Sequence, residues 1–252
     1  MVSPTAEQRA DRAATPRHVA IIMDGNSRWA AREGVMTALG HRAGVEAVRR
    51  VIDACEERGV EVLTLFTFSS ENWGRPEAEV RALMALFSRY LRRELEKLQR
   101  DNIRLRFIGR RDRFSPRLQR LMARTESATR NNTKATLVLA ADYGGRWDVA
   151  GATRDIAQRV VSGELSIDAI DENTVGAAMS LADIPAPDLC IRSGGDVRIS
   201  NFLLWQFAYT ELYFTDCLWP DFDAADLDAA FAEYSRRERR YGMRKIAKSG
   251  TQ

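Results

Sequence analysis

The sequence predicts a single α/β domain built on a mostly parallel six-stranded sheet that is flanked by helices. Short runs of continuous apolar residues alternate along the chain with longer segments whose apolar residues recur at helical spacing. Continuous apolar strands are typical of parallel sheets, and alternating strands and helices are typical of βαβ units. The chain has 252 residues, of which 45% are hydrophobic and 29% are charged, so it is long enough for one large core and unlike a disordered protein.

The first three predicted elements are a strand, a helix and a strand. The run HVAIIM at 18–23 predicts a buried strand because it stops at the polar sequence DGN. A helix is predicted over 45–57, where an apolar stripe at i, i+3, i+4 and i+7 is followed by Gly59. The run VEVLTLFTF at 60–68 predicts the second strand.

The middle of the chain repeats this order. Residues 77–98 carry seven apolar residues on one helical face, and Pro76 lies just ahead of them, as a first-turn proline would. The run IRLRFI at 103–108 alternates, which predicts a strand near an edge of the sheet. A helix at about 116–129 and a strand at 136–141 follow.

The last third contains the shortest strands. Helices are predicted at about 146–161 and 172–182, strands at 189–191 and 211–214, and a charged closing helix at 223–240. No linker or repeat divides the chain, so we expect one catalytic domain over 18–242. The polar sequences at 1–17 and 243–252 are expected to be flexible tails.

Composition excludes several classes of protein. No run approaches the roughly 18 to 20 apolar residues of a membrane span, and the N-terminus has no signal-peptide core. Three separated cysteines and two histidines cannot supply a plausible zinc site or a disulfide scaffold, which favours a cytoplasmic location. A net charge of +3 argues against a protein that coats nucleic acid.

Polar residues collect where the predicted strands end. Ligands of open parallel sheets bind at the carboxyl ends of the strands. The residues that follow the predicted strands are Asp24 with Asn26, the sequence SSEN at 69–72, Asp142 and Arg192. The sequence therefore predicts a ligand site at this edge of the sheet.

Three of these segments suit phosphate chemistry, and each has a simpler alternative. Asp24 could hold Mg²⁺ against a phosphate, or it could cap a helix. Residues 69–76 could bind a ligand or form a polar turn before a helix. Arg192 and Arg198, separated by a glycine pair, suit a diphosphate, although a glycine-rich turn with solvated arginines is the alternative. Glu211 lies among apolar residues, so it is either paired or a metal ligand.

The sequence lacks the motifs of several other phosphate-binding and hydrolytic enzymes. The chain has no P-loop, no dinucleotide-binding glycine pattern and no nucleophile elbow. The acidic sequence at 221–228 lies at the start of the closing helix, where capping explains it best.

Five ordered blocks resemble one known family. The blocks are HVAIIMDGNSRWA, LTLFTFSSENWGRP, LAADYGGRWD, DLCIRSGG and RISNFLLWQFAYTELYFTDCLWPDF. Together they are similar to the cis-prenyltransferases, the bacterial undecaprenyl diphosphate synthases among them. The resemblance implies Mg²⁺-dependent, sequential addition of isopentenyl diphosphate to an allylic diphosphate, farnesyl diphosphate above all. The implied product is undecaprenyl diphosphate, the lipid carrier precursor for cell-wall synthesis.

The resemblance also implies a homodimer, a hydrophobic tunnel for the growing chain, and a role for each matching residue. Asp24 and Asn72 match the catalytic positions, and Asp24 and Glu211 match the Mg²⁺ ligands. The substrate-binding positions are matched by Gly25, Asn26, Ser27, Arg28, Trp29, His41, Ser69, Ser70, Glu71, Trp73, Arg75, Arg192, Arg198, Ile199 and Ser200. Because an amide is a poor base, we expect Asn72 to orient a substrate while a diphosphate oxygen or water takes the proton.

Apolar residues near the predicted site have two readings. Trp29, Phe66, Phe68 and the stripe over 80–98 could line the tunnel, or the stripe could be an ordinary core face.

Three positions depart from the family pattern. Thr37 stands where many members carry an arginine, Ser27 replaces a common glycine, and Asp196-Val197 replaces a usual Glu-His pair. Asp24, Arg192, Arg198 and Glu211 are all kept, which argues against a non-catalytic member of the family.

Two further alternatives concern the product and the location. A synthase of a shorter or different product length is the main alternative, since the sequence does not define the depth of a tunnel. A hydrophobic product implies transient contact with the membrane surface. We therefore expect a peripheral position at the inner membrane face, with no membrane anchor.

Overall fold

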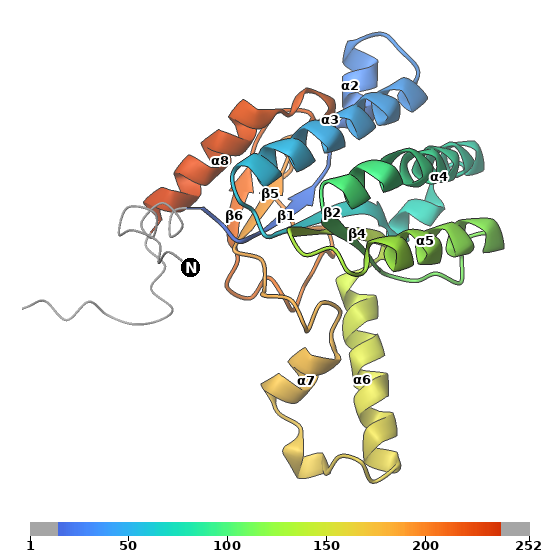
Figure 1. Ribbon diagram of the computed structural model, residues 1–252, viewed down its shortest axis with the longest axis vertical. Helices are drawn as coiled ribbons and strands as arrows, with labels where there is room; N and C mark the ends of the chain where they lie inside the picture. Colours follow the sequence, from blue (N-terminus) through green and yellow to red (C-terminus); the bar gives the residue numbers. More distant parts are fainter. Residues whose placement is uncertain (1–14, 238–252) are drawn as a thin grey trace, which may run out of the picture.

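The computed structural model describes residues 15–237, which form one six-stranded sheet (Figure 1). The strands are β1 (His18–Ile22), β2 (Val62–Ser69), β3 (Ile103–Ile108), β4 (Ala135–Tyr143), β5 (Leu189–Arg192) and β6 (Glu211–Phe214). Their order is β3-β4-β2-β1-β5-β6, and every neighbouring pair is parallel. The predicted α/β fold is confirmed, and β3 is an edge strand as predicted.

Helices cover both faces of this sheet. They are α2 (Asn26–Arg32), α3 (Thr37–Glu57), α4 (Glu77–Arg100), α5 (Pro116–Thr129), α6 (Gly145–Val161), α7 (Glu172–Ala178) and α8 (Ala224–Arg236), with short 3-10 helices η1 (Ser70–Gly74), η2 (Ile167–Ala169) and η3 (Trp219–Asp221). In Figure 1, α3, α4, α5 and α8 lie on one side of the sheet, and α6 and α7 extend from the other. No helix within 15–237 is long and apolar enough to cross a membrane.

The sheet separates two hydrophobic cores. Side chains alternate between the faces of a strand, so Val19 and Ile21 of β1 enter the core beneath α3, α4, α5 and α8. Ala20 and Ile22 enter the opposite core with Phe202 and other residues of the segment before β6. Both faces of β1 are therefore buried, which explains its continuous apolar sequence.

Helix α3 begins eight residues earlier than predicted. Gly40 and Gly44 interrupt the apolar stripe in its first two turns, and the structure shows what they contact. A Cβ atom at either glycine would lie 2.2 Å from an oxygen of Asn26. The two glycines thus let α2 pack closely against α3.

Other element boundaries differ less. Helix α7 ends at Ala178, four residues before the predicted end. Helix α4 begins at Glu77 as predicted, with Pro76 just ahead of it as the N-cap residue. Asp223 caps α8 through its side chain, which confirms the capping role of the acidic sequence there. Residues 238–240 of the predicted closing helix lie outside the described residues, as does most of both predicted tails. Arg17, at the border of the first tail, pairs with Glu61.

Candidate active site

A cleft of about 1010 Å³ opens at the carboxyl edge of the sheet, where β1, β2 and β5 end. Nine of the predicted site residues line it: Asp24, Arg28, Ser69, Glu71, Asn72, Arg75, Arg192, Arg198 and Ser200. They come from three segments that are distant in the sequence, at 24–28, 69–75 and 192–200. The structure therefore brings together most of the residues that the strand-end argument selected.

Asp24 lies at the centre of the charged groups in the cleft. Its Oδ2 accepts a hydrogen bond from Arg192 Nη2 at 2.8 Å, and its Oδ1 lies 3.1 Å from Arg28 Nη2. Burial raises the pKa of Asp24, but the hydrogen bond and charge of Arg192 and the charge of Arg28 outweigh burial and hold the pKa below its usual range. The carboxylate is therefore ionised at neutral pH and 30% exposed to the cleft.

The backbone after β1 needs glycine at position 25. Gly25 has a φ of 106°, in the left-handed region, and it is the N-cap residue of α2. A Cβ atom there would also lie 2.9 Å from Leu218. This turn starts α2 directly after Asp24, which places Arg28 one helical turn later, where its guanidinium donates to Gly194 O.

A loop after β5 holds the second group of cationic side chains. Arg192 is almost fully buried, and its Nη1 donates to Ser200 Oγ at 2.7 Å. Asp196 accepts from Arg198 at 2.7 Å and from Arg192 at 3.3 Å. Asp196 also lies 3.9 Å from Arg28. In this structure a carboxylate of the chain thus occupies the place between three arginines that an anionic ligand would take.

The 3-10 helix η1 presents the third group. A capping box fixes its start, because the backbone N–H of Ser69 donates to Asn72 Oδ1 at 3.0 Å. Glu71 Oε1 accepts from Asn201 Nδ2 at 2.8 Å. Burial raises the pKa of Glu71, yet the hydrogen bond from Asn201 and bonds from nearby donors lower it overall. Arg75 pairs with Glu79 at 3.0 Å.

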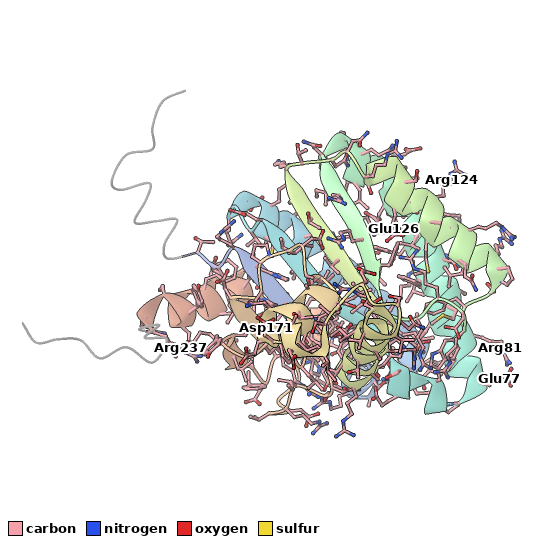
Figure 2. All side chains as sticks on the ribbon, turned by 90° about the horizontal axis from the view of Figure 1, so that it is seen from below. Glu77, Arg81, Arg124, Glu126, Asp171 and Arg237 are labelled. Atoms are coloured by element: carbon pink, nitrogen blue, oxygen red, sulfur yellow. The ribbon has the colours of Figure 1, made fainter. Side chains whose placement is uncertain are left out.

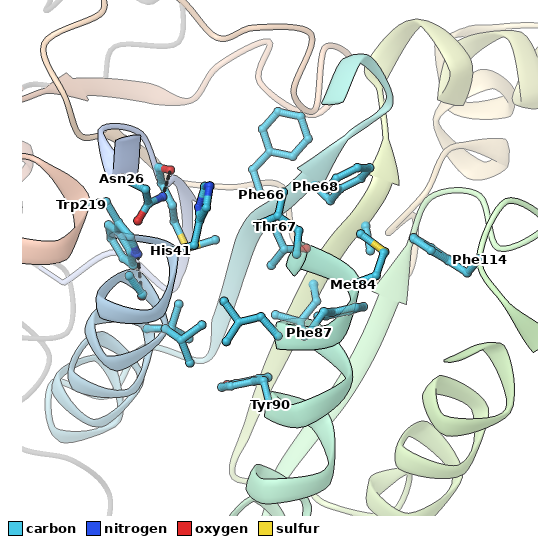
Figure 3. A pocket seen from close by; sticks show the side chains of 18 residues that line it. Asn26, His41, Phe66, Thr67, Phe68, Met84, Phe87, Tyr90, Phe114 and Trp219 are labelled. Atoms are coloured by element: carbon cyan, nitrogen blue, oxygen red, sulfur yellow. Dashed lines mark hydrogen bonds between the residues drawn. The ribbon is translucent and has the colours of Figure 1, made fainter. Parts of the chain in front are cut away.

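An apolar pocket of about 130 Å³ continues from the cleft between α3 and α4 (Figure 3). A polar cavity of about 150 Å³, which includes Gly25, Asn26, Ser27 and His41, lies between the two. Met23 and Phe66 line all three spaces. A ligand with a charged head and an apolar tail can therefore contact both surfaces.

His41 lies at the junction of the polar and apolar surfaces. Its Nε2 is 3.4 Å from Glu79 Oε1. Burial lowers the pKa of His41 more than Glu79 raises it, and the charge of Arg75 lowers it further. The ring is therefore neutral at physiological pH.

Several predicted residues lie elsewhere. Trp29 Nε1 donates to Asp221 Oδ1 at 2.7 Å, which ties the indole to η3 instead of the cleft. The Trp73 ring packs against Phe68, with centroids 5.1 Å apart, and Arg113 lies 4.6 Å above it. Ser70 and Ile199 are close in the chain to lining residues without lining the cleft themselves. Asp142, at the end of β4, is fully buried and also lies outside the cleft; burial raises its pKa.

Glu211 lies at the opposite edge of the sheet from Asp24. It is the first residue of β6, where it pairs in register with Leu189 of β5. Arg192, which contacts Asp24, pairs in register with Phe214 at the other end of β6. Three residues of strand separate the two pairs, roughly 10 Å. Glu211 pairs with Arg237 at 2.9 Å, and Figure 2 shows Arg237 far from Glu77 at the start of α4. Within one chain the two predicted metal ligands are not neighbours.

The acidic groups that do lie together could share an Mg²⁺ ion with a substrate. Asp24 Oδ2 and Asp196 Oδ2 both lie within 3.3 Å of Arg192 Nη2. Mg²⁺ is usually held by one or two carboxylates and completed by substrate phosphate oxygens and water. Within 15–237 there is no cluster of three or more His, Cys, Asp or Glu side chains for a metal, so a site here would depend on substrate oxygens.

Sequence reasoning gave no binding role to three polar residues that line the cleft, Arg146, Asp196 and Asn201. Asn201 Oδ1 accepts from the Arg146 backbone N–H at 2.9 Å, so Asn201 links the loop after β5 to α6 and, through Glu71, to η1. A signal was present for Arg146, which follows the end of β4, but Asn201 had no signal of its own beyond its place next to Ser200.

Several known proteins are similar to this chain in sequence and in fold. Residues 22–242 match the family model described as "Putative undecaprenyl diphosphate synthase". The chain is 57% identical over 231 residues to the farnesyl-diphosphate-specific ditrans,polycis-undecaprenyl-diphosphate synthase of Xanthomonas axonopodis pv. citri, covering 92% of this chain and 90% of that protein. It is 56% identical over 227 residues to the enzyme of the same name from Pseudomonas aeruginosa, covering 90% of each.

A solved structure with a different name also matches. It is lavandulyl diphosphate synthase from Lavandula x intermedia in complex with dimethylallyl diphosphate, with a TM-score of 0.88 and 39% identity over 91% of this chain and 99% of that one. The same fold therefore occurs in proteins named for different prenyl diphosphate products.

Proposed function

The chain belongs to the undecaprenyl diphosphate synthase family of cis-prenyltransferases, and from this we propose that it adds isopentenyl diphosphate units in sequence to farnesyl diphosphate. The product that we propose is undecaprenyl diphosphate, a carrier-lipid precursor for cell-wall synthesis. The observation that supports this most directly is the junction of the arginine-lined cleft with an apolar pocket. Relatives that are 57% and 56% identical carry the name of this activity.

The two diphosphates would occupy different parts of the cleft. Gly25, Asn26, Ser27, Arg28 and His41 line the small polar cavity next to the apolar pocket, which suits an allylic diphosphate whose tail enters that pocket. Arg192, Arg198 and Ser200 would bind isopentenyl diphosphate by charge-assisted hydrogen bonds. Asp196 now accepts from both arginines, so a diphosphate would take its place as their acceptor.

The reaction breaks the allylic C–O bond, forms a C–C bond and releases one proton and the diphosphate. Arg28 would donate to the leaving oxygens, whose negative charge grows in the transition state. Asn72 Oδ1 is engaged by the Ser69 backbone N–H, and an amide is a poor base. We therefore keep Asn72 as a group that orients substrate, with a diphosphate oxygen or water as the proton acceptor.

We propose Mg²⁺ as the cofactor. Asp24 is ionised and partly exposed, which fits a ligand of a hard cation. When bound, the ion would supply charge neutralisation to the departing diphosphate. For Glu211 to serve as the second ligand, as the family resemblance implies, it would have to reach the cleft from a second copy of the chain, because within one chain it lies at the other edge of the sheet.

A homodimer and a transient membrane contact complete the proposal. Trp205 and Tyr209 are exposed one turn apart in the segment before β6, and Tyr209 is 75% exposed. Exposed aromatic side chains of this kind favour a protein interface, which we assign to a second copy. Val35 and Met36, between α2 and α3, and Leu39, in the first turn of α3, are exposed, and Met36 is 73% exposed. They could touch a lipid surface during product release from a cytoplasmic enzyme at the inner membrane face.

The decisive experiment is a product assay. Purified protein is incubated with farnesyl diphosphate and labelled isopentenyl diphosphate, with Mg²⁺ or with EDTA, and product masses are measured. We expect long polyprenyl diphosphates, chiefly the C55 compound, only with Mg²⁺. No elongation would contradict the proposed function. A product that stops after one or two additions would instead support the alternative of a shorter-chain synthase, which the match to lavandulyl diphosphate synthase favours.

A further inference from the structure

The end of β4 carries a buried carboxyl group that the proposed function does not use. Along the pairing with β2, Phe68 is in register with Ala141 and Ser69 with Tyr143, so Asp142 is the extra residue of a β-bulge. Its φ is 52°, in the left-handed region that is uncommon for residues other than glycine. A bulge re-aims a side chain, so the regular alternation along a strand does not decide where Asp142 points.

Asp142 faces a donor that it does not quite reach. The residue is completely buried, and neither its carboxyl oxygens nor Nε1 of the buried Trp73 indole has a hydrogen-bond partner within 15–237. Arg113 Nη1 lies 3.7 Å from Asp142 Oδ1, too far for a hydrogen bond. Burial raises the pKa of Asp142 more than the indole N–H of Trp73 and the charge of Arg113 lower it. The indole N–H is therefore close enough to act on the carboxyl without completing a bond to it.

Trp73 connects this buried pair to the site. It belongs to η1, with Asn72 directly before it and Arg75 two residues after it, and both of these line the polar cavity. The Trp73 ring packs against Phe68 and Phe114, at centroid distances of 5.1 and 5.9 Å, and those two rings line the apolar pocket (Figure 3). The direction of the indole therefore affects both the polar and the apolar surface that an allylic diphosphate would contact.

The start of η1 also packs directly on this end of β4. A Cβ atom at Gly144 would lie 2.6 Å from Ser70 Oγ. Arg113 Cζ lies 4.6 Å from the centroid of the Trp73 ring, so this one guanidinium is shared between the ring and Asp142. Segments from the loop after β3, from β4 and from η1 thus meet behind the wall of the cleft.

On the basis of the proposed function, we infer that Asp142 is a positioning residue for η1: it anchors the Trp73 indole and so orients the cleft residues on either side of it. Those residues are Asn72 and Arg75. Asp142 itself does not line the cleft, so it acts only through η1. A buried donor and a buried acceptor that stay unpaired are costly. Binding of an allylic diphosphate is therefore favoured when it moves η1 far enough to complete the bond between them.

The test compares the two KM values of Asp142→Leu, which removes the acceptor at similar size. We expect the KM for farnesyl diphosphate to rise about fivefold or more, the scale for loss of one hydrogen bond. The KM for isopentenyl diphosphate should change by less than about twofold, because Arg192, Arg198 and Ser200 lie on another loop. Unchanged KM values, or an equal rise in both, would overturn the inference.

Asp142→Asn is the matched variant, because its amide oxygen can still accept the indole N–H. It should keep the KM for farnesyl diphosphate close to that of the unchanged chain. If Asp142→Asn raises this KM as much as Asp142→Leu does, the side chain does not act as an acceptor for Trp73, and the inference fails.

A double-mutant cycle tests the link between the two residues. Trp73→Phe keeps an aromatic ring and removes only the N–H group and the size of the indole. It should raise the same KM by a similar factor, and Asp142→Leu added to it should raise that KM no further. Effects that multiply would show that the two residues act independently, which would contradict the anchor.

A variant with a buried hydrogen bond removed elsewhere controls for lost stability. Thr129 is completely buried in α5, and its Oγ1 accepts from the Leu105 backbone N–H at 3.0 Å. Thr129→Val should lower the unfolding free energy and leave both KM values unchanged. A rise in the KM for farnesyl diphosphate like that of Asp142→Leu would show a general effect of instability and overturn the inference.

Failure of the inference differs from failure of the proposed function. If the unchanged chain elongates farnesyl diphosphate and Asp142→Leu keeps both KM values, only the role of Asp142 is wrong. If the unchanged chain makes no prenyl product, the proposed function is wrong and the role of Asp142 falls with it. Circular dichroism establishes folding of each variant. If Asp142→Leu does not fold, Trp73→Phe alone decides, and an unchanged KM for farnesyl diphosphate in it overturns the inference.

Discussion

Asp24 carries the charge arrangement on which the proposed chemistry depends. Both of its oxygens face guanidinium groups, and the carboxylate is still open to the cleft. We predict that Asp24→Ala lowers turnover by at least ~10²–10³, the scale for loss of a strong electrostatic stabiliser in a transition state. Steady-state kinetics at saturating substrates measure this. Turnover close to that of the unchanged chain, in a folded variant, would exclude a central role for Asp24.

Arg198 differs from Arg192 in its exposure. Its side chain is 61% exposed, and its charge meets Asp196. We predict that Arg198→Ala mainly raises the KM for isopentenyl diphosphate, by about tenfold or more, because one charge-assisted hydrogen bond to the diphosphate is lost. The KM for farnesyl diphosphate in the same variant is the internal control. An equal rise in both values would argue against separate sites for the two substrates.

His18 makes stability depend on pH. Its Nδ1 donates to Pro185 O at 2.6 Å, which leaves Nε2 to accept from Thr64 Oγ1 at 2.8 Å. Burial lowers the pKa of His18 to about 4. Below its unfolded pKa, near 6.5, the unfolded chain binds a proton that the folded chain does not, so stability falls as the pH drops from 6.5 toward 4.

The expected loss at His18 is about 2–3 kcal/mol of unfolding free energy between pH 7.5 and pH 4.5. Denaturant titrations at the two pH values measure it. The variant His18→Gln has no side chain at this position that titrates in this range. Its loss of unfolding free energy between the two pH values should therefore be smaller by about 2–3 kcal/mol. If both proteins lose the same free energy, the acid sensitivity comes from other groups.

The site was predictable where chain position determines geometry. Asp24, Asn72 and Arg192 follow strand ends, and parallel strands bring those ends to one edge. Trp29 was not predictable in this way, because its direction depends on how α2 turns toward Asp221. For Glu211 the predicted strand at 211–214 already began at that residue, which places it at the amino edge. The role of Glu211 as a Mg²⁺ ligand came from the family resemblance alone, which does not take its place in the strand into account.

Helices α2 and α3 illustrate what periodicity detects and what it misses. The apolar stripe of α3 marks only the part that covers the sheet, whereas its first two turns face α2 and use glycine. Close packing of one helix backbone against another leaves no apolar pattern. The strands, by contrast, were placed to within two residues at either end. Burial on both faces gives β1, β2, β4 and β5 continuous apolar runs, and an alternating sequence marks β3.

The close contact of α2 and α3 gives a prediction with an internal control. Gly40→Ala places a methyl group 2.2 Å from Asn26 O, so α2 must shift. We expect a loss of about 1–3 kcal/mol in unfolding free energy. Gly151→Ala in α6 has open space around its Cβ and should stabilise by about 0.4–1 kcal/mol. Denaturant unfolding compares the two, and a neutral Gly40→Ala would contradict the packing account.

At the scale of the whole molecule, the proposed homodimer depends on apolar residues left exposed. We predict that Trp205→Glu combined with Tyr209→Glu turns a dimer into a monomer, because two charges would be buried in the interface without partners. Light scattering with size-exclusion chromatography measures the mass. The same changes to Val161 and Ile167, which are also exposed, serve as the control. A mutant that stays dimeric would place the interface elsewhere.

The order of strands in the sheet has a consequence for biosynthesis. The central strand β1 pairs with β5, and Asp24 and Arg192 are 168 residues apart in the chain. At roughly 5–20 residues per second, a ribosome needs on the order of 10–30 s to synthesise this interval. Throughout that time one edge of β1 has no neighbour. The Asp24 carboxylate and its guanidinium partner therefore meet only near the end of translation, and any nascent chain released before residue 192 lacks the loop that carries Arg192 and Arg198.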